Sequence, residues 1–257
     1  MKLRSIATGA ALACALGAAQ AGPTVTGTYD ATLLANTIAG VGITISNPTL
    51  TFAGSNTLPA PAGTFTGGAS TVGFASGIVL TNGTVGCAGS GNTSASCELE
   101  RSPSNEPNTS NYDRTTLAFD FTSSTGQVFF RYVFASEEYT TFVNSSFNDA
   151  FRLLLNGNNI ALLPGGGGVV EINNVNCGTN SAYYRNNVNP ANGNESNNTC
   201  TSLMLDIQYD GLTTVLTASG TVAANTTNTF EFTIFDRGDN SLDSGVYIEA
   251  GSFSGED

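Results

Sequence analysis

The fold class is decided by two neighbouring stretches, Leu117-Ala118-Phe119-Asp120-Phe121 and Val128-Phe129-Phe130-Arg131-Tyr132-Val133-Phe134. In the first stretch, large apolar side chains alternate with small or polar ones, which is typical of a strand with one buried face. The second stretch is an aromatic and β-branched run, which favours a central strand. Between them, Ser123-Ser124-Thr125-Gly126 has the composition of a turn. The sequence therefore predicts two strands joined by a turn.

Similar short segments recur along the chain, separated by turns rich in Gly, Asn and Ser. Asn156-Gly157 predicts a hairpin turn between Phe151–Leu155 and Ile160–Leu163. About ten short strands joined in this way indicate an all-β fold, a single β-sandwich or jelly-roll-like domain. Further strands are predicted at Gly42–Ser46, Thr71–Thr81, Ala150–Leu155, Val169–Ile172, Leu203–Tyr209, Thr213–Thr217, Thr229–Phe235 and Gly245–Ala250.

One segment predicts a helix instead of a strand. Ala31–Ala39 contains good helix formers, with Asp30 as the N-cap and Gly40 as the residue that ends the helix. Two long polar stretches, Ala88–Asn111 and Gly178–Thr199, interrupt the strands. Stretches of this length in a compact domain predict surface loops.

The first 21 residues predict a secretory signal peptide. Lys2 and Arg4 precede an apolar stretch, and Ala19-Gln20-Ala21 supplies the small residues of a cleavage site. A buried N-terminal helix is the alternative. No later run has the 18 to 20 apolar residues that a membrane-spanning helix needs, so no transmembrane segment is expected after removal of the leader. Residues 22–257 contain no linker or repeat, which predicts one domain.

The composition excludes several kinds of chemistry. The 257 residues include 8 Lys+Arg, 20 Asp+Glu and no His, a formal net charge of −12. Removal of the leader leaves six Arg against the 20 acidic residues, a charge of −14, with no Lys, His or Trp. Nucleophiles paired with His, imidazole ligands, P-loops and Schiff bases are therefore excluded. A surface of this charge repels phosphate backbones, so no nucleic-acid partner is expected.

Four cysteines remain after the leader: Cys87, Cys97, Cys177 and Cys200. An even number in an exported chain predicts disulfide bonds. Four cysteines allow three pairings, and we favour Cys87 with Cys97 and Cys177 with Cys200 because each pair closes a polar loop. A metal site is the alternative, but the chain has no Cys-x-x-Cys and no His to complete it.

The acidic residues gather in three segments: Ala135-Ser136-Glu137-Glu138-Tyr139, Asn148-Asp149, and Asp236-Arg237-Gly238-Asp239-Asn240-Ser241-Leu242-Asp243-Ser244. Carboxylate, amide and carbonyl oxygens are the ligands that Ca²⁺ prefers, and a Gly in the third segment allows a sharp turn. Solvated turns, or an Arg237–carboxylate ion pair, are the alternatives, because the segment does not match an EF-hand. The predicted metal ligands are Glu137, Glu138, Asp149, Asp236, Asp239 and Asp243.

Nine short segments, taken in order, resemble the choice-of-anchor L domain, a bacterial surface and secreted module. They are Asn36–Ile43, Gly77–Thr81, Phe134–Tyr139, Asn148–Phe151, Asn159–Pro164, Ile172–Asn176, Tyr209–Leu216, Phe235–Asp239 and Asp243–Ile248. The resemblance implies an all-β extracellular domain without an established catalytic role, usually tethered by a C-terminal anchor. It also strengthens the calcium prediction, because the acidic segments are among those that match. The chain ends at Asp257 without a hydrophobic sorting tail, so we expect secretion or non-covalent surface association.

The leading hypothesis is a secreted or cell-surface, non-catalytic structural or adhesive module of the extracellular matrix, stabilised by disulfides and calcium. Its expected partners are matrix or surface components, which include glycans and further copies of the chain. The acidic residues would then converge around an ion at one end of the sandwich. Sequons such as Asn82, Asn144 and Asn225 predict exposed loops.

Two other functions remain as alternatives. A carbohydrate-binding module would use an aromatic platform, for which the candidates are Tyr112, Tyr139, Tyr183 and Tyr184, although the absence of Trp counts against it. A hydrolase would need two carboxyl groups across a cleft, such as Glu137 or Glu138 with Asp236. Asp243-Ser244-Gly245 resembles the aspartic protease motif but occurs once.

Overall fold

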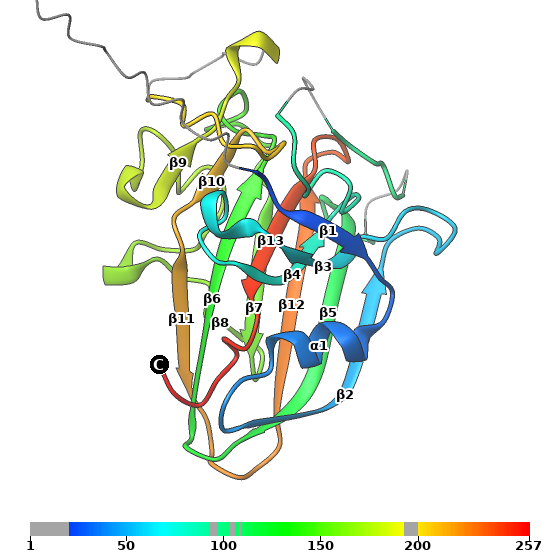
Figure 1. The fold of residues 1–257 in the computed structure, drawn as a ribbon, viewed down its shortest axis with the longest axis vertical. Coiled ribbons are helices and arrows are strands. Elements are labelled where there is room, and N and C mark those ends of the chain that lie inside the picture. Colours follow the sequence, from blue (N-terminus) through cyan, green and yellow to red (C-terminus); the bar gives the residue numbers. More distant parts are fainter. Residues whose placement is uncertain (1–20, 93–96, 103–105, 108, 193–199) are drawn as a thin grey trace, which may run out of the picture.

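Two antiparallel sheets face each other in a computed structural model of the chain, which describes residues 21–92, 97–102, 106–107, 109–192 and 200–257 (Figure 1). The strands of the larger sheet lie in the spatial order β1 (Thr24–Gly27), β3 (Ala62–Thr66), β4 (Ser76–Thr81), β13 (Ser244–Glu249), β6 (Gln127–Ser136), β10 (Gly211–Thr213) and β9 (Tyr184–Asn186), with β11 (Leu216–Thr221) also beside β6. The strands of the smaller sheet are β2 (Ile43–Phe52), β5 (Asn111–Ser123), β12 (Asn228–Arg237), β7 (Ala150–Leu155) and β8 (Asn158–Asn159). The predicted all-β sandwich is confirmed.

The hydrophobic core lies between the two sheets. Leu117, Phe119 and Phe121 of β5 are buried, as their alternation predicts, and so are Phe130 and Tyr132 of β6. β5 and β6 follow each other in the chain but belong to different sheets, so the turn between them carries the chain from one sheet to the other. Each large apolar side chain buried in this way contributes about 1.5–3 kcal/mol.

The predicted helix is confirmed as α1 (Ala31–Ile38), which packs its Leu34, Ala35 and Ile38 into the core. The Asp30 side chain accepts hydrogen bonds from Thr32 N and Leu33 N at 2.9 and 3.0 Å, which satisfies two free donors of the first turn. A Cβ at Gly40 would overlap the carbonyl oxygen of Gly251. The close approach of two backbones therefore requires glycine where the helix ends.

Several predicted boundaries are wrong. Leu203–Tyr209 has strand composition but no strand partner in the structure. The side chain of Asn187 replaces that partner: its Oδ1 accepts from Leu205 N at 2.6 Å, and its Nδ2 donates to the carbonyls of Ile207 and Tyr209 at 3.0 and 2.9 Å. Val169–Ile172 takes part only in isolated bridges. Short 3₁₀ turns occur at Gly68–Ser70, Pro164–Gly166, Ser181–Tyr183 and Pro190–Asn192.

Both favoured disulfides are confirmed. The Cα atoms of Cys87 and Cys97 are 5.5 Å apart, and those of Cys177 and Cys200 are 5.7 Å apart, within the usual range for bonded cysteines. The predicted signal peptide lies outside the described residues, apart from its last residue. Among the residues that the structure describes, no helix is long and apolar enough to span a bilayer.

Candidate functional site

Five of the six predicted metal ligands lie together at one end of the sandwich, and we call this group the acidic cluster: Glu137, Glu138, Asp149, Asp236 and Asp243. Each is at most 2% exposed. The strand register explains the convergence, because Ser136 pairs with Ser244 in one sheet and Ala150 pairs with Phe235 in the other. The four strand ends that carry these carboxyl groups lie at the upper end of the molecule in Figure 1.

The sixth predicted ligand, Asp239, lies beside this group in the loop between β12 and β13. It is half-buried, and its Oδ1 accepts a hydrogen bond from Ser241 N at 3.5 Å. Partial burial raises the pKa of the Asp239 carboxyl, and the nearby Glu98 acts in the same direction. Asp239 is close enough to Glu138 to raise the pKa of that carboxyl as well.

The centre of the cluster is a pair of carboxyl groups, Asp149 and Asp236, whose side chains share a hydrogen bond. Asp149 accepts from Arg237 N at 3.1 Å, Ser244 Oγ at 2.8 Å and Asn82 Nδ2 at 3.3 Å. Asp236 accepts from Asn82 Nδ2 through Oδ1, while its Oδ2 is buried without an amide or hydroxyl donor. Three donors stabilise a charge on Asp149, so the shared proton belongs to Asp236.

Burial shifts both members of this pair toward the protonated form. Desolvation raises the pKa of Asp149 to about 6, against the opposing effect of its hydrogen-bond donors. Desolvation and the charge of Asp149 raise the pKa of Asp236 well above its ordinary value. At neutral pH the pair therefore carries one negative charge and one proton.

The other three carboxyl groups of the cluster are also shifted. Desolvation raises the pKa of Glu137 to about 9 and that of Asp243 to about 8, although both accept backbone hydrogen bonds. Burial and the charge of Asp149 raise the pKa of Glu138 to about 10. Glu138 Oε2 is buried without a hydrogen-bond partner among the described residues. These three groups therefore retain protons at neutral pH as long as no cation replaces them.

An extended segment, residues 97–102, crosses the cluster and donates backbone hydrogen bonds to it. Cys97 N donates to both oxygens of Glu137 at 2.8 and 2.9 Å, and Leu99 N lies 3.4 Å from Asp243 Oδ1. Arg101 N donates to Asp113 at 2.7 Å. Alternate residues of an extended chain point the same way, so three N–H groups face three carboxyl groups. The Cys87–Cys97 disulfide holds one end of this segment to the sandwich.

Two residues of this site were missed by the sequence analysis. Asn82 was predicted to mark an exposed loop, but it is fully buried between Asp149, Asp236 and Ser244, whose N donates to Asn82 Oδ1 at 2.7 Å. The sequence feature that could have indicated its burial is its position directly after a predicted strand. Asp113 is 2% exposed, and desolvation raises its pKa to about 6. Nothing in the pattern around Asp113 distinguishes it from an exposed strand residue.

Positive charge is scarce around the cluster. Arg101 is 4% exposed, but its guanidinium donates to the carbonyl oxygens of Ala53, Pro59 and Gly83. The ion pairs seen within the described ranges, Arg114–Glu106 and Arg131–Glu249, lie outside the cluster. The alternative of an Arg237–carboxylate ion pair is not observed there either. The carboxyl groups must therefore be compensated by protons or by a bound cation.

The ligand chemistry, though not the present spacing, is that of a hard-cation site: every candidate ligand is an oxygen, and Glu138 Oε2 and Asp236 Oδ2 are buried without an amide or hydroxyl donor. In the arrangement described here, no three Asp, Glu or Cys side chains of the described residues form a group that could hold a metal ion. The carboxyl groups would therefore have to move closer together to hold an ion. Uptake of an ion would require the shared proton to leave.

Gly83 provides the space into which the Asp243 carboxylate fits, because a Cβ at this position would overlap it. We expect Gly83→Ala to lower the free energy of unfolding by about 1–3 kcal/mol, the usual cost of overpacking. Gly86→Ala is the matched control, since the nearest atom to its Cβ would be 3.5 Å away. Urea denaturation of both variants tests this prediction, and equal stability of the two would contradict it.

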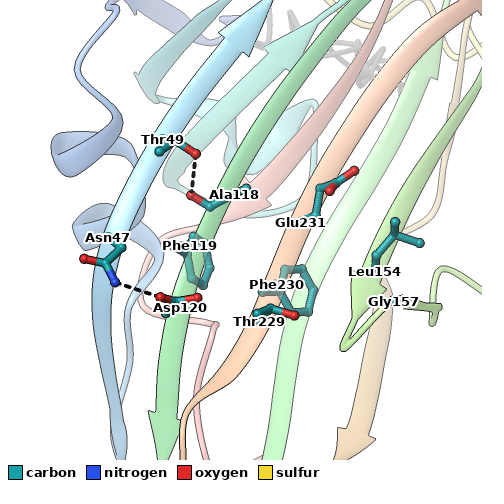
Figure 2. A pocket seen from close by; sticks show the side chains of 10 residues that line it. All are labelled: Asn47, Thr49, Ala118, Phe119, Asp120, Leu154, Gly157, Thr229, Phe230 and Glu231. Atoms are coloured by element: carbon teal, nitrogen blue, oxygen red, sulfur yellow. Dashed lines mark hydrogen bonds between the residues drawn. The ribbon is translucent and has the colours of Figure 1, made fainter.

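Two of the four candidate tyrosines are too buried to serve as a sugar-binding platform, whereas Tyr112 and Tyr183 are half-buried. Tyr139 and Tyr184 are buried, with ring centroids 4.8 Å apart, and they pack into the core. A hollow of about 320 Å³ lies on the five-stranded sheet. Figure 2 shows the residues that line it, which include the polar side chains of Asp120 and Glu231. Two aromatic residues line it, Phe119 and Phe230, but they are only 3% and 1% exposed. The hollow therefore presents no ring on which a sugar could stack.

Comparison with known proteins gives one match. No curated protein and no solved structure matches the chain. The family model described as the choice-of-anchor L domain matches residues 24–254, which include both sheets, the two disulfides and the whole acidic cluster. The chain therefore belongs to the choice-of-anchor L domain family, a family of surface and secreted modules.

Proposed function

We propose that this protein is a non-catalytic structural module of the extracellular matrix or cell surface, and that its acidic cluster binds Ca²⁺ in exchange for protons. The observation that carries the proposal is a group of five buried carboxyl groups, none of which forms an ion pair with a cationic side chain of the described residues; Arg101 acts on Asp243 only from beyond ion-pair distance. Buried carboxylates in proteins are paired, protonated or bound to metal. An extracellular protein meets calcium at concentrations at which even moderately weak sites are filled.

The chemistry of the ligands favours calcium over other metals. All candidates are carboxylate, amide or carbonyl oxygens, and the described chain has no His or free thiol near them. Glu138, Asp149 and Asp236 would hold the ion after a movement of their side chains toward one another, because the first and third supply oxygens without an amide or hydroxyl donor and the second carries the charge. A bound ion would supply the positive charge that the surrounding side chains lack.

The same burial argues against catalysis. Asp149 and Asp236 share a proton, as the two carboxyl groups of an aspartic protease do. Here, however, they are 0% and 1% exposed, and Glu137 and Glu138 are 2% and 1% exposed. A substrate could not reach any of these groups without unfolding this end of the sandwich.

A structural or adhesive role is supported by the loops at the same end. The side chain of Asn92, in the first disulfide-bearing stretch, donates to the carbonyl oxygen of Asn187 at 2.9 Å, and Asn189 Nδ2 donates back to Asn92 O at 2.7 Å. The two cross-linked stretches are thus fastened to each other as well as to the sheets. Calcium would stiffen the base of a loop surface that matrix components could bind.

Calcium titration of two substitutions by calorimetry tests the proposal. Asp236→Asn replaces a protonated carboxyl by an amide of the same shape, whose N–H can still donate to Asp149. We expect it to fold with at least the stability of the wild type in EGTA at neutral pH, because it removes a carboxyl group whose raised pKa costs stability there, and to bind Ca²⁺ at least 10-fold more weakly. Asp149→Asn should destabilise the fold itself, because its amide would face donors.

Asp120→Asn is the matched control, since it makes the same chemical change on the outer side of the five-stranded sheet. It should bind calcium like the wild type. The calcium proposal is wrong if the wild type takes up no Ca²⁺, or if Asp236→Asn binds it as tightly as the control.

A further inference from the structure

The side of the five-stranded sheet that faces away from the core, here called the outer face, carries charges of opposite sign at its two ends. Positive side chains lie toward the end that holds the acidic cluster, and negative side chains lie toward the opposite end. This arrangement is unexpected in a chain of net charge −12, where a uniformly negative surface would be the simplest outcome. Polar or small side chains from β5 and β12 lie between the two ends.

The positive end is built around Phe235. The guanidinium carbons of Arg114, Arg152 and Arg237 lie 5.4, 5.3 and 5.7 Å from the centre of its ring, and Phe235 is fully buried. We call this group the arginine cluster. Arg114 is paired with Glu106. Arg152, which is exposed, and Arg237 have no ion-pair partner in the described part of the chain, so two positive charges are left uncompensated.

The negative end contains Asp120 and Glu231, which line the hollow shown in Figure 2. Asp120 accepts a hydrogen bond from Asn47 Nδ2 at 2.7 Å, and Glu231 accepts one from the hydroxyl of Thr233 at 2.9 Å. These contacts orient both carboxylates, but no Arg of the described residues forms an ion pair with either.

The strand register places these charges symmetrically. Leu117, Phe232 and Leu153 form one row across β5, β12 and β7, and all three point into the core. Arg152 lies in the next row on one side, opposite Thr233, and Glu231 lies in the next row on the other side, opposite Leu154. Consider a two-fold axis that lies above the central row, parallel to the sheet and perpendicular to its strands. Rotation about this axis exchanges the row of Arg152 with the row of Glu231.

We propose that two copies of this chain pack face to face through the outer face about such an axis. Arg152 of each copy then lies opposite Leu154 of the other, one strand away from Glu231 in the same row, and the arginine cluster enters the hollow beside Asp120 and Glu231 of the second copy. Four charges that lack ion-pair partners within one chain would be paired across the interface. The proposal deepens the matrix role by naming a partner, but it uses none of the residues proposed to bind calcium.

A second copy fits this face better than an anionic polymer does. A polyanion drawn to the arginine cluster would also meet Asp120 and Glu231 on the same face and would be repelled by them. A partner must instead present negative and positive groups in the reverse order, which a second copy does by symmetry. Repulsion between the two net charges is screened beyond about 8 Å at physiological salt.

The size of the face is compatible with a specific but not very tight dimer. Five strands of 10, 13, 10, 6 and 2 residues, at about 3.3 Å per residue and about 4.8 Å between strands, present roughly 650 Å². A standard interface buries about 800 Å² per partner. We therefore expect a dimer that forms at micromolar concentrations rather than an obligate one.

Charge reversal tests the proposal by analytical ultracentrifugation in 0.15 M NaCl with EGTA. The wild type is expected to dimerise at tens of micromolar. Arg152→Glu and Glu231→Arg should each weaken the dimer at least 10-fold, and the double variant should regain it. Glu256→Arg, which makes the same charge change at an exposed site near the C-terminus, should dimerise like the wild type.

A monomeric wild type at 100 μM would overturn the proposal, as would unaltered dimerisation of the single variants or a double variant that stays monomeric. Thermal melting of each variant verifies that it is folded. Because EGTA is present throughout, this outcome is separate from that of the calcium titration.

Discussion

Millimolar Ca²⁺ is expected to raise the melting temperature of the protein by about 5–10 °C relative to EGTA at pH 7.5. A ligand at 100 times its dissociation constant stabilises the folded state by about 2.7 kcal/mol. For a chain of this length, each kcal/mol corresponds to about 2–4 °C. The ion would act where five carboxyl groups are buried and the nearest arginine, Arg101, donates to carbonyls.

The controls for this experiment follow from the site. Asp236→Asn should melt at or above the wild-type temperature in EGTA, because the cost of keeping a proton on Asp236 is removed, but it should lose most of the calcium shift. Mg²⁺ should stabilise less, since it requires a smaller octahedral shell and dehydrates reluctantly. Superimposable wild-type melting curves in Ca²⁺ and EGTA would contradict the account.

Without calcium, the free energy of unfolding is expected to fall as the pH rises from about 5 to about 9. In the unfolded chain the carboxyl groups titrate near pH 4, whereas burial raises the pKa of Asp243 to about 8 and that of Glu137 to about 9. Between these values the folded state holds more protons than the unfolded state, so raising the pH favours unfolding. Each proton retained only by the folded state gives a slope of about 1.4 kcal/mol per pH unit.

Urea denaturation across this pH range in EGTA measures the slope directly. With saturating Ca²⁺ the slope should become shallower, because the ion rather than protons compensates the carboxylates. The Asp236→Asn variant should also have a shallower slope in EGTA, since one titrating group is removed. Stability in EGTA that increases from pH 5 to pH 8 would show that the carboxyl groups are not shifted as described.

The sequence was most informative where the alternation of side chains reflects burial. Leu117, Phe119 and Phe121 are buried as predicted, because a strand with one face on the core has a period of two. The short strands β1 and β3 were not predicted, since segments such as Ala62-Gly63-Thr64-Phe65-Thr66 contain too few large side chains to show a pattern. Leu203–Tyr209 was misassigned, because the contribution of the Asn187 side chain is a tertiary effect.

The acidic cluster could be predicted in part, because carboxylates at the ends of consecutive elements converge when the strands pair. Five of the six candidate residues do converge in this way. The sequence could not reveal Asn82 as the link between Asp149 and Asp236, because strands far apart in the chain bring these residues together. It also could not reveal the charge pattern of the outer face, which depends on the register of β5, β12 and β7.

Calcium titration in two buffers of different ionisation enthalpy tests the central claim most directly. If Ca²⁺ replaces protons in the acidic cluster, its binding at pH 7.5 should release at least about one proton per ion, and the observed heat should differ between the buffers accordingly. Asp236→Asn should show neither the binding nor the proton release. Calcium binding with the same heat in both buffers, or no binding to the wild type, would contradict the account.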